Sequence, residues 1–195
     1  ARAIDEGVGK ILHALDETGQ SARTLVVFTS DQGFAFGQHG LRMKVAPYDA
    51  ALRAPLIVSM PGTISEGKVC TTAVGGHDLV PTFFAFAGID LPWAMHGRDL
   101  TQLLRNPERA SDHPVFMTYT GWAYGSETGN IPAESKHGSK YPWWVSYRRG
   151  NFKYIRHLLP GEIEELYQLD ADPDELTNLA MDADYAEQLA EYRQA

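Results

Sequence analysis

The stretch Thr24-Leu-Val-Val-Phe-Thr29, followed directly by Ser30-Asp-Gln-Gly33, decides the fold of this chain. Its apolar run is too short for a helix and shows no alternation of polar and apolar residues. Runs of this kind form strands that are covered on both faces, as in the centre of an α/β sheet. We therefore predict a buried strand over 24–29 within an α/β domain.

The segments around this strand extend the α/β pattern. Apolar residues recur at helical spacing over 4–15, and a second apolar strand over 55–60 ends at a Pro-Gly turn. A further helix is predicted over 78–88, where Gly88 supplies the stop. The order helix, strand, strand, helix is typical of an α/β domain.

The carboxyl-terminal part has a different pattern. Short β-rich runs and a Gly-Asn turn predict a small antiparallel sheet, followed by an acidic helix; the runs are 114–119, 143–149, 152–157 and 165–169, and the helix is 182–193. A long loop rich in Gly, Ser and Pro spans 121–142. We predict that residues 1–112 belong to an α/β domain, and that residues 113–195 form a small α+β subdomain with an antiparallel sheet.

Composition excludes several classes of protein. The 195 residues carry 17 basic and 25 acidic side chains, a formal charge of −8, which leaves no electrostatic footprint for nucleic acid. No apolar run approaches the roughly 20 residues of a membrane span. Cys70 is the single cysteine, so an intrachain disulfide and a Cys-rich zinc site are excluded, and we expect it to be a small buried apolar residue.

The residues that carry chemistry begin where the first strand ends. In open α/β sheets ligands bind at the carboxyl ends of strands, and Asp31 and Gln32 lie there with two hard oxygen donors suited to Ca²⁺ or Mg²⁺. Lys44, later in the same segment, offers a cation to an anionic substrate. The alternative is an ordinary turn, in which Asp31 bonds its own backbone and Lys44 is a surface cation.

These residues belong to a longer pattern that resembles the sulfatase family of the alkaline phosphatase superfamily. The pattern covers nearly the whole chain in the family's order: 24–33, Gly37-Gln-His-Gly-Leu41, Lys44 with Tyr48, 52–58, 78–82, 96–100, 152–155 and 165–179. The resemblance implies an alkaline-phosphatase-like fold, in which residues 1–112 form part of a mixed sheet sandwiched by helices, and it implies the hydrolysis of sulfate esters. It implies that Asp31 and Gln32 are metal ligands and that Lys44 contacts the substrate sulfate.

The resemblance also implies cofactors and a missing part. The family uses one divalent ion, for which we expect Ca²⁺ here, with Mg²⁺ as the alternative. It also uses a formylglycine made from Cys or Ser. No nucleophile motif occurs in these residues, and Cys70 is followed by Thr71-Thr72-Ala73-Val74, which does not match it. We therefore expect the formylglycine in an amino-terminal part of the same protein. The 195 residues alone are then inactive and prone to self-association.

Two alternatives stay open at this point. A phosphodiesterase or phosphonate hydrolase of the same superfamily would share Asp31 and Lys44, and a non-catalytic module could retain the fold for binding. The substrate is expected to be a sulfated small molecule or glycan, with Trp122 and Tyr124 of the long loop stacking on a ring and His39 as a further contact. The residues do not decide between a periplasmic, secreted or cytoplasmic location.

Overall fold

The computed structural model describes residues 2–108, 112–121, 123–129, 143–158, 161 and 163–195. Its contacts divide the chain into two compact units. Unit 1 comprises Ala1–Ser30 and Pro55–Ala110, and unit 2 comprises Asp31–Ala54 and Ser111–Ala195. Every helix in the described part of the chain is too short or too polar to span a bilayer.

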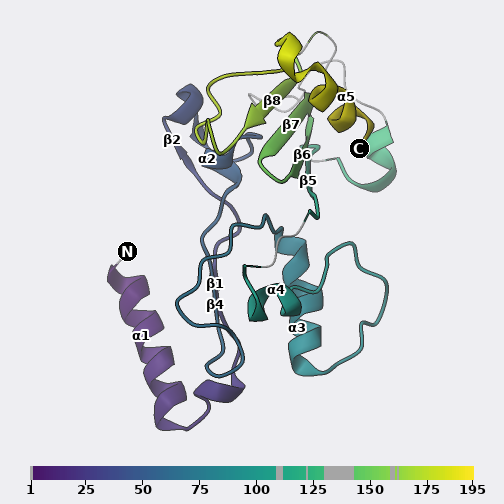
Figure 1. Cartoon of the computed structure of the whole chain (residues 1–195). Helices are drawn as coiled ribbons and strands as arrows, with labels where there is room; N and C mark the ends of the chain where they lie inside the picture. Colours follow the sequence, from purple (N-terminus) through teal and green to yellow (C-terminus); the bar gives the residue numbers. More distant parts are fainter. Residues whose placement is uncertain (1, 109–111, 122, 130–142, 159–160, 162) are drawn as a thin grey trace. The chain divides into compact units, whose positions relative to one another are not determined.

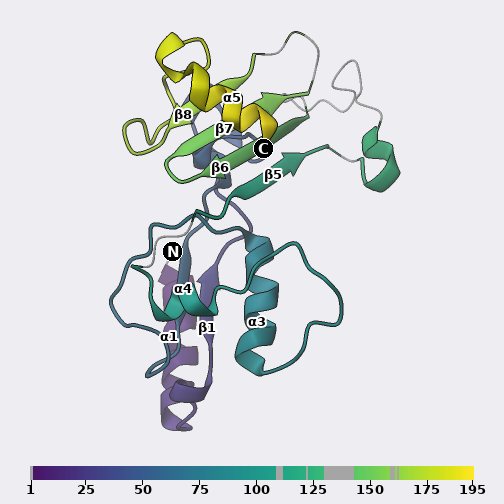
Figure 2. The same ribbon diagram turned by 45° about the vertical axis from the view of Figure 1, so that its right-hand side comes forward.

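Unit 1 contains the helices and strands predicted for the amino-terminal half. Strands β1 and β4 pair antiparallel, with Val26 opposite Ser59 and Thr29 opposite Leu56 (Figure 1). Helix α3 packs beside the short helix α4 (Figure 2). The elements are α1 (Arg2–Glu17), η1 (Ser21–Arg23), β1 (Val26–Thr29), β4 (Leu56–Ser59), η3 (Gly76–Asp78), α3 (Leu79–Ala87) and α4 (Thr101–Arg105).

A buried carboxylate fixes the start of α3. Asp78 is fully buried and accepts hydrogen bonds from the backbone N–H groups of Gly75 (2.9 Å) and Arg98 (2.8 Å). A side chain at Gly97 would collide with the carbonyl oxygen of His77, 1.9 Å from where its Cβ would lie, so only glycine fits there. The segment after α3 is therefore tied back to the beginning of the same helix.

Two predictions of burial in unit 1 are wrong. β1 and β4 form only a two-stranded ribbon among the described residues, so their apolar side chains are not covered on both faces. Phe28 and Leu56 are exposed, and Ile57 keeps 62% of its accessible surface. Cys70 is also exposed rather than buried. An exposed apolar ribbon of this kind invites pairing with further chain.

Unit 2 is built on the predicted antiparallel sheet. Its strand order is β5-β6-β7-β8, and every neighbouring pair is antiparallel. The strands are β5 (Val115–Tyr119), β6 (Trp144–Arg149), β7 (Phe152–His157) and β8 (Glu165–Gln168), and helices η4 (Gly125–Gly129), η5 (Ala183–Tyr185) and α5 (Ala186–Gln194) complete the carboxyl-terminal part. The four β-rich runs read from the sequence each become one of these strands.

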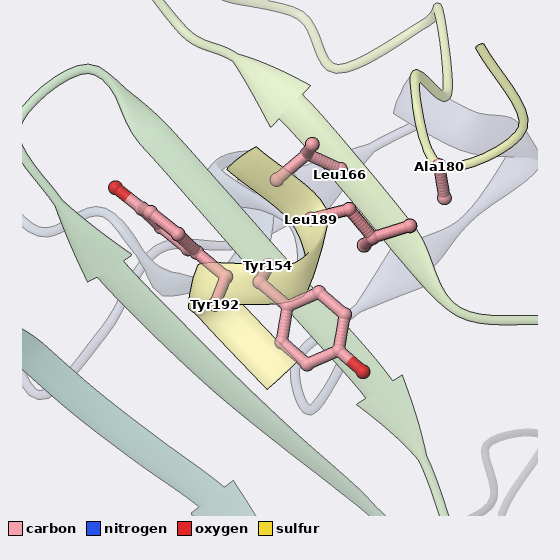
Figure 3. Packing of buried hydrophobic residues seen from close by; sticks show 5 residues of the cluster. All are labelled: Tyr154, Leu166, Ala180, Leu189 and Tyr192. Atoms are coloured by element: carbon pink, nitrogen blue, oxygen red, sulfur yellow. The ribbon is translucent and has the colours of Figure 1, made fainter. Parts of the chain in front are cut away.

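One face of this sheet packs against the last helix. Tyr154 of β7 and Leu166 of β8 are opposite one another in register, and both belong to a buried cluster that includes Leu189 and Tyr192 of α5 (Figure 3). Ala180 completes the cluster. Side chains alternate between the two faces of a strand, so the residues next to Tyr154, Lys153 and Ile155, must lie on the opposite face.

The opposite face receives the segment 31–54, which belongs to unit 2. Ile155, Tyr167 and Leu169 form a second buried cluster, and Tyr48 packs against it. The segment contains β2 (Ala35–Phe36), η2 (Gln38–Gly40), β3 (Arg42–Met43) and α2 (Asp49–Leu52), none of which the sequence predicted. A boundary between residues 1–112 and 113–195 stays a prediction.

Tyr192, which α5 buries against the sheet, gives an alkaline test of this packing. Burial raises the pKa of Tyr192 to about 12 from its ordinary value of 10.0. Because the folded-state pKa is raised, its contribution to stability is complete below pH 10 and is lost as pH rises towards 12. We expect Tyr192→Phe to unfold with a shallower dependence on pH over that range, measured by thermal melts.

The matched control is Tyr124→Phe, because Tyr124 is 69% exposed. It should keep the wild-type dependence of melting temperature on pH. An unchanged slope in Tyr192→Phe would contradict the packing of α5 on this face of the sheet.

Candidate functional site

Asp31 and Lys44, which the sequence singled out, meet in the structure. The Lys44 ammonium donates to Asp31 Oδ2 at 2.6 Å, and Asp31 Oδ1 accepts the backbone N–H of Gln32 at 2.9 Å. The hydrogen bond from Lys44, then that from Gln32, lowers the pKa of the Asp31 carboxyl. Asp31 is therefore held in its ionised form beside a cation.

A small hairpin returns the chain from Asp31 to Lys44. Strands β2 and β3 pair antiparallel, with Ala35 opposite Met43 and Phe36 opposite Arg42. At the tip, the side-chain oxygen of Gln38 accepts the backbone N–H of Phe36 at 2.7 Å. The hairpin brings Asp31 and Lys44 together. Their spacing in the sequence alone does not indicate this contact.

The backbone on both sides of Lys44 is strained. Met43 has φ 111° and Val45 has φ 71°, in the region that favours glycine. Such residues cost on the order of 1–3 kcal/mol each and persist only where the surroundings impose them. Here the indole N–H of Trp144 donates to the carbonyl oxygen of Val45 at 2.9 Å, from a side chain that is itself buried. Lys44 is thus placed by the sheet of unit 2.

Gly33 positions the other end of the pair. Its Cα lies so close to α2 that a Cβ would be 2.8 Å from the carbonyl oxygens of both Ala50 and Arg53. Only glycine permits this approach, because real Cβ atoms do not come so near to backbone oxygens. The chain leaving Asp31 and Gln32 is therefore pressed directly against α2.

His39 lies at the tip of the hairpin and is held by two contacts. Its ring stacks on Tyr48 with centroids 3.9 Å apart and planes 5° apart, and Nε2 is 2.9 Å from the carbonyl oxygen of Asp174. Tyr124, the aromatic candidate of the long loop, is largely exposed. Trp122 and most of the loop 121–142 lie outside the described residues.

The donor chemistry fits part of a divalent-ion site. Asp31 is 72% exposed, and Lys44 is 39% exposed, so both groups are accessible to a ligand. A carboxylate and an amide oxygen suit Ca²⁺ or Mg²⁺, but Ca²⁺ takes roughly six to eight oxygens. No group of three or more His, Cys, Asp or Glu side chains that could hold a metal occurs among the described residues. Asp31 and Gln32 can thus supply only a share of the ligands.

Sequence reasoning missed the charged cluster beneath this segment. Lys153 of β7 lies 2.8 Å from Asp49 Oδ1 and 2.5 Å from Glu175 Oε1, and Arg148 of β6 lies 3.4 Å from Asp49 Oδ2. The available signal was Lys153 between Phe152 and Tyr154 in a β-rich run. Because side chains alternate along a strand, the pattern indicates that Lys153 lies on the opposite face from Phe152 and Tyr154. It does not identify Asp49 and Glu175 as the charges that pair with Lys153.

Comparison with known proteins identifies the family. Residues 37–195 match the family model described as N-sulphoglucosamine sulphohydrolase, C-terminal. The chain belongs to the sulfatase family. It is 33% identical over 193 residues to N-acetylglucosamine-6-O-sulfatase of Bacteroides thetaiotaomicron, an alignment that covers 98% of this chain and 33% of that sulfatase. The chain spans about a third of the length of the curated sulfatases it matches.

Solved structures agree with this assignment. One, in complex with its substrate D-glucosamine-2-N,6-O-disulfate, has a TM-score of 0.82 at 29% identity and covers 98% of this chain and 37% of its own. The phosphonate monoester hydrolase of Agrobacterium radiobacter has a TM-score of 0.76 at 28% identity, over 98% and 38%. The alkaline-phosphatase-like fold class is confirmed. Membership of the sulfatase family implies its general use of a metal ion and a formylglycine.

Gly33→Ala tests whether α2 sets the position of Asp31 and Gln32. The added methyl group meets two carbonyl oxygens, so α2 and the chain after Asp31 must separate. We expect a loss of about 1–3 kcal/mol in the free energy of unfolding. Gly7→Ala is the control, because the Cβ at Gly7 in α1 meets no atom within 4 Å. Equal stability of the two variants would contradict the close approach of Gly33 to α2.

Proposed function

We propose that this chain supplies part of the metal and sulfate site of a sulfatase, an enzyme that hydrolyses sulfate esters. The observation that carries the proposal is the contact between Asp31 and Lys44 in a chain of the sulfatase family. Asp31 and Gln32 act as metal ligands, and Lys44 contacts the sulfate group. The remaining ligands and the nucleophile come from a part of the protein outside these 195 residues.

The roles of the residues follow from their charges. A metal ion held in part by Asp31 and Gln32 would neutralise negative charge on the sulfate oxygens, and a formylglycine hydrate would supply the attacking oxygen. Lys44 adds a second positive charge that donates hydrogen bonds to the transferring group, where charge builds up in the transition state. Asp31 holds the Lys44 ammonium at 2.6 Å, so the lysine is already oriented before a sulfate arrives.

We propose Ca²⁺ as the metal, with Mg²⁺ as the alternative. Asp31 supplies one carboxylate, and Gln32 supplies a neutral amide oxygen. Ca²⁺ accepts both carboxylate and amide oxygens in flexible geometry, whereas Mg²⁺ demands a near-octahedral shell and keeps several waters. The wide exposure of Asp31 leaves room for a large coordination shell.

The proposed substrate is a sulfated sugar or a sulfated small molecule. Relatives named N-acetylglucosamine-6-O-sulfatase and choline-sulfatase span these two classes, at 33% and 34% identity. We propose Trp122 and Tyr124 as stacking contacts for the substrate, supported for Tyr124 by its exposure. His39 is proposed as a substrate contact at the hairpin tip, although Tyr48 and Asp174 hold its ring.

A phosphonate or phosphate ester hydrolase is the second candidate. The observation in its favour is the likeness to the phosphonate monoester hydrolase of Agrobacterium radiobacter, at 28% identity. A metal ion and a lysine would serve phosphoryl transfer as well as sulfuryl transfer, because both reactions depend on positioning and charge neutralisation. Three sulfatases are 33–34% identical to this chain over 89–98% of its length, compared with 28% for the phosphonate monoester hydrolase. This difference favours the first candidate.

Three substitutions in the full-length protein test the proposal. Asp31→Ala and Lys44→Ala should each lower kcat/KM for an aryl sulfate by on the order of 10²–10³-fold, and Asp31→Ala should also weaken Ca²⁺ binding. Gln32→Ala should have a smaller effect on Ca²⁺ binding, because the amide is neutral. The 195-residue chain alone should show no turnover, since groups that act as a unit lose nearly all activity together.

Lys10→Ala, an exposed lysine in α1, is the control and should retain wild-type kcat/KM. Parallel assays with an aryl phosphonate monoester decide between the two candidates, since the preferred substrate is the one with the higher kcat/KM. Near-normal kcat/KM of Lys44→Ala on both substrates would show that Lys44 does not contact the reacting group.

A further inference from the structure

β8 and the chain after it contact the segment 31–54 at three points. The carbonyl oxygen of Asp174 lies 2.9 Å from His39 Nε2, and Glu165 Oε1 accepts the hydroxyl of Tyr48 at 3.2 Å. Glu175 Oε2 accepts the backbone N–H of Asp49 at 2.5 Å. These contacts join residues more than 100 positions apart and include neither Asp31 nor Lys44.

The contact at Asp49 belongs to a buried network of four charges. Lys153 and Glu175 are each 1% exposed and 2.5 Å apart, and Lys153 also donates to Asp49 Oδ1 at 2.8 Å. Arg148 brings a second positive charge to within 3.4 Å of Asp49 Oδ2. The two positive and two negative charges balance, so removing any one of them leaves an uncompensated charge in the interior.

Such a network is a poor device for stability alone. Burying charges carries a desolvation penalty that their mutual attraction need not recover, and apolar residues of similar volume often stabilise as well or better. Glu175 is also in a left-handed conformation, with φ 56°, which residues with a Cβ rarely adopt. The network therefore combines buried charges with a left-handed residue, both of which cost free energy. It does so where Glu175 and Lys153 fix the position of Asp49.

The position of Asp49 is connected through α2 to the chain that carries Asp31. Asp49 is the first residue of α2, so Glu175 and Lys153 hold the start of that helix. The carbonyl oxygens of Ala50, within α2, and of Arg53, just after it, lie against Gly33. Gly33 follows Asp31 by two positions. A shift of α2 therefore moves the chain that carries Asp31 and Gln32.

We propose that Glu175 and Lys153 are positioning residues, which fix α2 and thereby the separation of Asp31 and Lys44. They act through Asp49 and touch no reacting group. The link to catalysis rests on the proposed function, whereas the effect on the segment 31–54 does not. A displacement of about 1 Å at a reacting centre can lower a rate by roughly 10²-fold, so a small movement of α2 is sufficient.

The experiment compares Glu175→Ala and Glu175→Gln in the full-length protein. Alanine removes both the charge and the acceptor for the Asp49 N–H, whereas glutamine keeps an acceptor of the same length. We expect Glu175→Ala to speed amide hydrogen exchange in residues 31–54 and to lower kcat/KM per active site for an aryl sulfate by roughly 10-fold or more. Glu175→Gln should recover part of both losses.

Asp112→Asn is the matched control. Asp112 also pairs with an arginine of β6, Arg149, but this ion pair is exposed, so its loss should leave exchange in 31–54 and kcat/KM within about twofold of wild type. A merely structural role for Glu175 predicts faster exchange in β6 and β7 as much as in 31–54, with kcat per active site unchanged. That result would overturn the proposal.

A second variant covers the case in which Glu175→Ala does not fold. Lys153→Met/Glu175→Gln removes one charge of each sign, keeps the volume and keeps an acceptor for Asp49. It should fold, exchange faster in 31–54 and have lower kcat/KM, because Asp49 loses its bond to Lys153. Wild-type exchange in 31–54 would overturn the proposal. If the wild-type protein hydrolyses no sulfate ester, the proposed function fails, while the exchange measurements still decide the role of Glu175 and Lys153.

Discussion

The segment 31–54 is held on the sheet of unit 2 by the hydrogen bond between the Glu175 carboxylate and the backbone N–H of Asp49, supported by Lys153. It joins the start of α2 to the turn that follows β8, and so attaches the segment 31–54 to the sheet. Nothing in the short hairpin β2–β3 would hold that segment by itself, because two paired residues on each side give little stability in water. The site is therefore a product of the carboxyl-terminal sheet.

The alternation of side chains along β7 explains how one sheet serves two purposes. Tyr154 points to the face covered by α5, and Lys153 and Ile155 point to the face that receives Tyr48 and α2. The α5 face is an ordinary apolar core, whose role is stability. The other face carries charges and aromatic rings, and it meets the one segment that holds Asp31 and Lys44. One sheet thus carries both the apolar core under α5 and the contacts that hold the segment 31–54.

The sequence predicted local structure well and long-range pairing poorly. The helix over 4–15 and the β-rich runs could be predicted because their periodicity and turn residues are local. Asp31, Gln32 and Lys44 were proposed as site residues from a strand end and from the resemblance of the chain to sulfatases, and their roles stay a prediction. The hairpin β2–β3 and α2 were missed because they are too short to show a period. The partners of Lys153 were missed because Asp49 lies 104 positions away and Glu175 lies 22 away, across different elements. Burial of the strand over 24–29 was overestimated, because apolar composition indicates a covered strand without showing which chain covers it.

A crystal structure of the full-length protein with Ca²⁺ and an unreactive sulfate-ester analogue would test whether the segment 31–54 supplies metal ligands and a sulfate contact. We expect a Ca²⁺ ion at about 2.3–2.6 Å from a carboxylate oxygen of Asp31 and from the side-chain oxygen of Gln32. We also expect the Lys44 ammonium to donate a hydrogen bond to a sulfate oxygen. A bound ion coordinated by neither Asp31 nor Gln32, with Lys44 turned away from the sulfate, would show that the segment 31–54 does not supply this site.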